Sequence, residues 1–156
     1  MKGDPRVIEV LNDVLCAELT AINQYFIHGM MCKNWHYEAL AKHGRDESID
    51  EMKHAQEVIE RILYLDGVPN MQKYMKINVG PTVPEQHAFD LDLERGAVAR
   101  LNAGIETCRA AGDNGSRLLL ESILKEEEEH IDWLEAQIQQ IAELGLPNYL
   151  ANQADD

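Results

Sequence analysis

Glutamate and histidine recur in this chain at one fixed spacing. Glu51 precedes His54 by three residues, and the same Glu-x-x-His pair returns at Glu127 and His130. Residues three apart are neighbours on a helix surface, so each pair presents both side chains on one face. A further glutamate precedes each pair at the same distance, which gives two copies in register, 76 residues apart: Glu18, Glu51, His54, Glu94, Glu127 and His130. The repeated set predicts two halves of one dinuclear metal site.

The chemistry of these six side chains favours transition-metal ions. Each lies on or beside an apolar helical stripe, so it is expected to point into the interior of a helix bundle. A buried lone carboxylate is strongly unfavourable, and these stripes carry no lysine or arginine to pair with it. Two divalent cations would balance four carboxylates. Carboxylate oxygen together with imidazole nitrogen suits iron or manganese better than structural zinc.

Chance placement on a solvated surface is the competing interpretation. The chain has 17 glutamates and 6 histidines, so one accidental Glu-x-x-His pair is expected. The shared register of all six residues on apolar stripes argues against chance. The remaining histidines are expected to be structural or exposed: His28, His36, His43 and His87. The glutamates beside Glu127 lie on other helix faces and are expected to be solvated: Glu126, Glu128 and Glu129.

The elements that must position these residues are helices. Asp4-Pro5 and Asp113 have the composition of helix N-termini, and Gly112 and Gly145 that of helix ends. Helices are expected from residue 5 to about 33, over 37–65, over 83–111 and from 113 to 144, with 66–82 as a long connection and one or two helical turns in the tail. Two helical hairpins joined by a long crossover predict a single all-α domain over 1–156, a ferritin-like four-helix bundle plus a short C-terminal helix.

Composition excludes several partners. The 156 residues carry 28 acidic and 14 basic side chains, a net charge of −14, so neither nucleic acid nor an anionic membrane is an expected partner. Apolar runs fall short of the ~20 residues of a membrane span, and the first residues lack the apolar core of a signal peptide. The three cysteines form no CxxC pair. We therefore expect a cytoplasmic protein.

Several longer motifs resemble those of the bacterioferritins over essentially the full chain. They are the opening residues 1–4, ELTAINQYF at 18–26, SIDEMKHA at 48–55, GVPN at 67–70, HIDWLE at 130–135 and NYL at 148–150. The resemblance implies a cage of 24 subunits that stores ferric mineral, with a ferroxidase di-iron centre in each bundle and a haem shared between paired subunits. It implies that the six residues above are the iron ligands, with Glu51 and Glu127 as bridges. His130 favours this family over haem-free ferritins.

Met52 is the candidate haem ligand. It points about 100° away from Glu51 around the helix, onto a second apolar face with Ile49, Ile59 and, from the first helix, Leu19, Phe26 and Met30. A two-fold axis at Met52 would supply two thioether ligands to one haem iron. Ordinary packing at a dimer interface is the alternative interpretation.

One further iron site is suggested by the resemblance. Asp46 stands where several relatives carry a histidine on the cavity wall, and Asp50 follows one turn later, so both are candidates for inner-surface iron. Tyr25 and Trp133 are expected near the metal centre, where they would either pass electrons or pack in the core.

The expected function is iron storage and detoxification, in which O₂ or H₂O₂ oxidises Fe(II) to Fe(III) before mineralisation. The resemblance adds a ferredoxin-like reductant as a partner for iron release. Two other functions remain open at this point: a haem-binding partner subunit whose bundle is mainly structural, and a small di-iron oxygenase or peroxidase.

Overall fold

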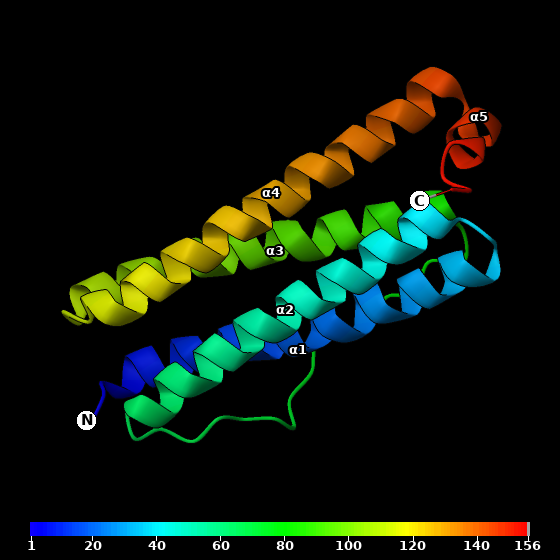
Figure 1. Ribbon diagram of the computed structural model, residues 1–156. Helices are drawn as coiled ribbons and strands as arrows, with labels where there is room; N and C mark the ends of the chain where they lie inside the picture. Colours follow the sequence, from blue (N-terminus) through cyan, green and yellow to red (C-terminus); the bar gives the residue numbers. More distant parts are fainter. Residues whose placement is uncertain (156) are drawn as a thin grey trace.

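Helices account for the regular structure of residues 1–155, which the computed structural model describes. Four are long and one is short (Figure 1): α1 (Pro5–Asn34), α2 (Glu38–Tyr64), α3 (Val83–Ala110), α4 (Asn114–Leu144) and α5 (Leu146–Ala151). The expected spans are confirmed to within a few residues, as are the long connection and the short C-terminal helix.

Side-chain caps fix the helix starts. The Asp4 carboxylate accepts the N–H of Arg6 at the start of α1, and Asp113 accepts the N–H of Ser116 at 2.9 Å at the start of α4. Thr82 does the same for α3 by accepting from Glu85. Such caps satisfy backbone donors that have no partner inside the helix.

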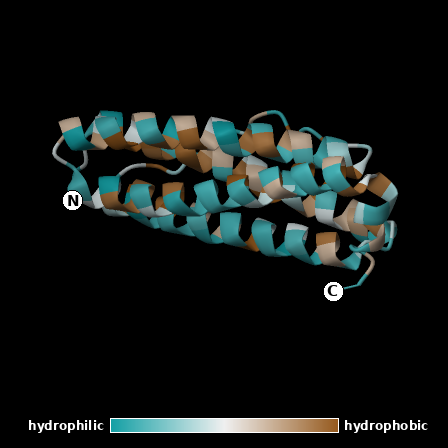
Figure 2. Ribbon diagram, turned by 90° about the horizontal axis from the view of Figure 1, so that it is seen from above, coloured by the Kyte–Doolittle hydropathy of each residue, from teal (hydrophilic) through white to brown (hydrophobic). Residues whose placement is uncertain are grey.

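The helices pair as two hairpins, α1 with α2 and α3 with α4, which lie side by side (Figure 1). Gly44 lets α1 and α2 approach closely, because a Cβ there would lie 2.8 Å from the Cα of Gly29. The outer faces are largely hydrophilic (Figure 2). Within the described residues, no helix combines the length and apolar character needed to cross a membrane.

Two apolar clusters occupy the interior, and the predicted metal ligands lie between them along the bundle. The larger, toward the N-terminal end, includes Leu11, Leu15, Ile62 and Leu120. The smaller, at the end where α5 packs, includes Cys32, Leu40, Val83 and Tyr149. Apolar packing on both sides therefore holds the polar centre of the bundle in place.

The crossover from α2 to α3 runs along α1 (Figure 1) and is fixed there by side-chain acceptors. Thr20 Oγ1 accepts the N–H of Met75 at 2.9 Å, and Gln24 Oε1 accepts that of Asn78 at 3.1 Å. Nε2 of His28 accepts the N–H of Gly80 at 2.9 Å and completes the series. This return along the bundle is the ferritin-like topology that the sequence predicts.

Candidate metal centre

The six predicted ligands meet in the middle of the bundle. Each of the four helices contributes, and none of the six residues is more than 8% exposed. Helices α1 and α3 each supply one glutamate, Glu18 and Glu94. Helices α2 and α4 each supply a Glu-x-x-His pair. The sequence register therefore corresponds to a shared location in space.

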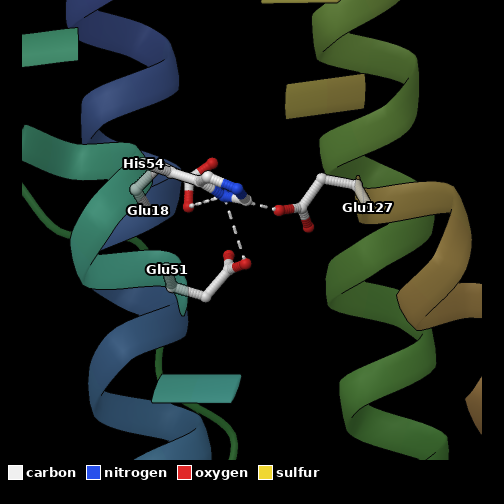
Figure 3. A group of neighbouring side chains, drawn as sticks. All are labelled: Glu18, Glu51, His54 and Glu127. Carbon is white, nitrogen blue, oxygen red and sulfur yellow. Dashed lines mark ion pairs between the residues drawn. The ribbon is translucent and has the colours of Figure 1, made fainter. Parts of the chain in front are cut away.

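One half of the centre is drawn in Figure 3. Ligand atoms of Glu18, Glu51, His54 and Glu127 all lie within 4.8 Å of one another. Nδ1 of His54 is 3.5 Å from Glu18 Oε2, 3.4 Å from Glu51 Oε1 and 3.1 Å from Glu127 Oε1. Carboxylates from both hairpins thus converge on one imidazole nitrogen.

The other half is built in the same way and shares two residues with the first. Ligand atoms of Glu51, Glu94, Glu127 and His130 again lie within 4.8 Å of one another. Nδ1 of His130 is 3.5 Å from Glu51 Oε1 and 3.6 Å from Glu94 Oε1. Glu51 and Glu127 belong to both groups, which is where bridging ligands of two metal ions would lie.

The hydrogen bonding of the centre fits metal ligation. Each of the six residues has at least one buried nitrogen or oxygen atom without a hydrogen-bond partner among the described residues, including both carboxylate oxygens of Glu127. Buried polar atoms are nearly always satisfied in folded proteins. Coordinated cations would satisfy these atoms together, since they face one another at ligand distances from a common point.

Burial and mutual contacts shift the pKa values of these groups. Burial raises the pKa of Glu51 and Glu94 well above the usual range, and neighbouring carboxylates add to the rise. Burial opposes ionisation of Glu127 as well, but contacts with Glu94 and the histidines hold its pKa well below the usual range. Burial alone would lower the pKa of His54, yet contacts with Glu127 and Glu18 raise it to about 11. The raised pKa values mean that cations bound to these residues would displace protons from them.

Tyr25 supports one ligand directly. Its hydroxyl donates a 2.6 Å hydrogen bond to Oε1 of Glu94, and the phenol is 2% exposed. Trp133 instead stacks on His43, with ring centroids 3.4 Å apart. Tyr25 thus contacts one of the six candidate ligands, whereas Trp133 stacks on a histidine outside that set.

Two carboxylates near the histidines fall outside the predicted set. Glu47 is 8% exposed and contacts His130, and Glu126 is hydrogen-bonded to His54. The Glu126 side chain is 54% exposed, as expected, and its carboxylate also reaches His54. One sequence feature points to Glu47: it lies four residues before Glu51, which places both side chains on one face of α2.

The two candidates for inner-surface iron, Asp46 and Asp50, contact different groups. Asp46 Oδ2 is 2.8 Å from Lys42 Nζ on the exposed side of α2. Asp50 instead belongs to a group with Glu47 and His130, whose ligand atoms lie within 4.8 Å of one another.

Met52 lines a groove of about 600 Å³ on the surface of the α1–α2 hairpin. Its side chain is 55% exposed, and Phe26, Met30 and Ile49 line the same groove. Leu19 and Ile59, which were expected on the same face, do not line the groove. Leu19 is buried in the larger apolar cluster, and Ile59 is partly buried against it.

The remaining histidines are structural or exposed, as expected. His28 is buried and contacts Asp90 at 2.9 Å, and His87 is buried against Tyr149 at 3.0 Å. His43 stacks on Trp133, and His36 is exposed in the turn between α1 and α2. Not one of these four is in the two groups that form the metal centre.

Fold and donor set together define the class as a ferritin-like bundle with a candidate dinuclear metal centre. The sequence model of the family described as "Ferritin-like domain" matches residues 8–144. The chain is 49% identical over 151 residues to a bacterioferritin of Mycobacterium bovis, covering 97% of this chain and 95% of the relative. It is 48% identical to a bacterioferritin of Streptomyces coelicolor, covering 97% and 90%, and 43% identical to one of Brucella melitensis, covering 96% and 92%. The chain belongs to the bacterioferritin family.

Proposed function

We propose that this protein stores iron and that each chain oxidises Fe(II) at the metal centre. The observation that carries the proposal is the pair of four-residue ligand groups that share Glu51 and Glu127. With O₂ the balance is 2 Fe²⁺ + O₂ + 2 H⁺ → 2 Fe³⁺ + H₂O₂, and with peroxide it is 2 Fe²⁺ + H₂O₂ + 2 H⁺ → 2 Fe³⁺ + 2 H₂O. Paired ions suit both reactions, because each oxidant accepts two electrons.

The protein groups contribute charge and geometry. Four carboxylates balance the positive charge of two Fe(II) ions and stabilise the additional charge of Fe(III). Tyr25 holds the Glu94 carboxylate in place through the 2.6 Å hydrogen bond. The raised pKa values of Glu51 and Glu94 make binding of Fe(II) release protons, which supports tighter binding at higher pH.

Storage requires a container, and membership of the family supports a cage of 24 copies of this single-domain chain, residues 1–156. The net charge of −14 favours accumulation of Fe(II) near such an assembly. We place the oxidised iron inside the cage as ferric mineral, the protein in the cytoplasm, and a ferredoxin-like protein as the electron donor for iron release.

The groove at Met52 fits one half of a haem site. Met52 would supply the axial thioether, Phe26 and Ile49 the apolar walls, and Lys33 and Arg45 the positive charge for the haem carboxylates. A second copy related by a two-fold axis would supply the other half. Haem bound there would supply one-electron transfer.

Asp46 and Asp50 would hold iron on its way between the centre and the cavity. The ligand atom of Asp50 lies within 4.8 Å of those of Glu47 and His130, and Asp46 contacts Lys42 at the exposed surface.

The proposal is tested by aerobic addition of two Fe(II) per chain to the metal-free protein, followed by Fe(III) absorbance. Rapid oxidation is expected in the wild type and loss of the rapid phase in Glu127→Ala, because that change removes a ligand from both groups. Glu128→Ala is the matched control, since Glu128 is the exposed neighbour of Glu127. Equal rates in all three proteins would overturn the proposal.

A further inference from the structure

Two carboxylates contact the outer nitrogen of the two histidines in the metal centre. Glu126 of α4 is hydrogen-bonded to Nε2 of His54 on α2. Glu47 of α2 has its Oε2 atom 2.5 Å from Nε2 of His130 on α4. Each histidine is therefore held by a carboxylate from the opposite helical hairpin.

We propose that Glu47 and Glu126 are positioning residues: they keep the imidazole proton on Nε2 and so present Nδ1 to the metal ions. This inference rests on the proposed function. A neutral imidazole has one N–H and one lone pair, and a carboxylate at one nitrogen places the proton there. Nδ1 of both histidines is the atom that faces the shared glutamates, at 3.1 to 3.7 Å.

Glu47 and Glu126 do not occupy equivalent positions, although the six candidate ligands repeat along the chain. Adding 76 to Glu47 gives Ile123, so Glu47 has no counterpart in the repeat. Subtracting 76 from Glu126 gives Asp50, a carboxylate whose ligand atom lies within 4.8 Å of those of Glu47 and His130. The Glu47 side chain is 11% exposed, whereas that of Glu126 is 54% exposed. Water competes more with the Glu126 contact than with the Glu47 contact.

Glu47 and Glu126 are each expected to affect the binding of one of the two metal ions. His130 occurs only in the group with Glu94, and His54 occurs only in the group with Glu18. Loss of Glu47 should therefore weaken the ion beside Glu94, and loss of Glu126 the ion beside Glu18. A change that merely loosened the fold would weaken both ions together.

Calorimetric titration with Co²⁺, which needs no oxidation step, tests the inference together with the visible spectrum of bound Co²⁺. The wild type is expected to bind two ions per chain. Glu47→Ala should weaken one of them about 10- to 100-fold, and Glu126→Ala should weaken the other toward the lower end of that range. Glu47→Gln should restore most of the affinity, because its amide oxygen keeps a polar acceptor in contact with Nε2 of His130. Glu129→Ala, an exposed neighbour, is the control.

The outcomes separate the two claims. Wild-type affinity and spectrum for both ions in Glu47→Ala and Glu126→Ala would overturn the positioning role and leave the proposed function intact. Failure of the wild type to bind two Co²⁺ would overturn the metal centre and the positioning role with it. Because Glu126 is exposed, its variant tests the inference even if Glu47→Ala folds poorly.

Discussion

Neighbouring groups decide which side chains of this protein carry a proton. Glu51 and Glu94 lie close to other carboxylates in a buried site, and burial raises the pKa of both. His87 shows the opposite case: burial lowers its pKa to about 4, although the nearby Asp90 carboxylate opposes this shift. Protonation is thus set at the level of the single residue, by what each side chain contacts.

The low pKa of His87 predicts a loss of stability in acid. Between pH 6.5 and about 4 the unfolded chain binds a proton at this histidine and the folded protein does not, so stability falls as pH falls through that window. The slope from one such group is at most about 1.4 kcal/mol per pH unit. Urea unfolding at pH 7 and pH 5 should show a smaller pH dependence in His87→Gln than in the wild type.

His36→Gln serves as the control for this comparison, because His36 is exposed. The same pH dependence in His87→Gln and the wild type would show that the buried imidazole is not the group responsible.

The convergence of the six candidate ligands could be predicted from the sequence, whereas the contacts of Glu47 and Glu126 with the two histidines could not. Glu51 and His54 repeat as Glu127 and His130, and a repeat on apolar stripes is visible without coordinates. Glu47 has no counterpart in the repeat, whereas Glu126 corresponds to Asp50. Their contacts depend on how α2 and α4 are rotated about their axes, which no single-helix pattern determines.

Among the elements, the crossover is the segment whose position depends most on individual hydrogen bonds. Its backbone N–H groups donate to side chains spaced four residues apart on α1, and Nε2 of His28 accepts the N–H of Gly80 at 2.9 Å. Gly80 must be a glycine, since a Cβ there would lie 2.4 Å from the backbone N of Gln86. The segment is therefore held along α1 without any secondary structure of its own.

His28→Leu is expected to destabilise the protein by about 1–3 kcal/mol, because it leaves the buried N–H of Gly80 without an acceptor and removes a partner of Asp90. Urea unfolding measures the loss, and faster amide exchange at Gly80 localises it. Gln139→Leu, on the exposed side of α4, should leave both unchanged. Unaltered exchange at Gly80 in His28→Leu would contradict this account of the crossover.

For the crossover, the sequence predicts the presence of a long connection but not its path. The prolines and the missing period of 66–82 predict a long connection correctly. The ladder of Thr20, Gln24 and His28 lies on a regular helix face, but its partners are backbone groups of an irregular segment. Backbone donors have no sequence signature, so the path of the connection could not be predicted.

At the scale of the whole molecule, the groove at Met52 gathers exposed apolar side chains on one face of the α1–α2 hairpin. Phe26, Met30 and Met52 are each more than half exposed and line one groove. Exposed apolar area of this kind favours a second copy or a cofactor over water. The sequence predicts the face, and the structure adds that Lys33 and Arg45 lie at its edge.

Met52→Leu is expected to abolish the visible absorption of bound haem in the purified protein while preserving assembly, since leucine keeps the apolar surface and removes the thioether. Met30→Leu is the matched control, because Met30 lines the same groove and should leave the spectrum unchanged. Solution mass checks assembly in both. An unchanged haem spectrum in Met52→Leu would exclude Met52 as the axial ligand.

The most direct test of the metal centre is to locate iron in crystals soaked with Fe(II) without oxygen, using the anomalous signal of iron. Two peaks per chain are expected at the centre, one beside Glu18 and His54 and one beside Glu94 and His130, with Glu51 and Glu127 between them. A single peak there, or iron found only elsewhere on the chain, would contradict a shared site for two ions.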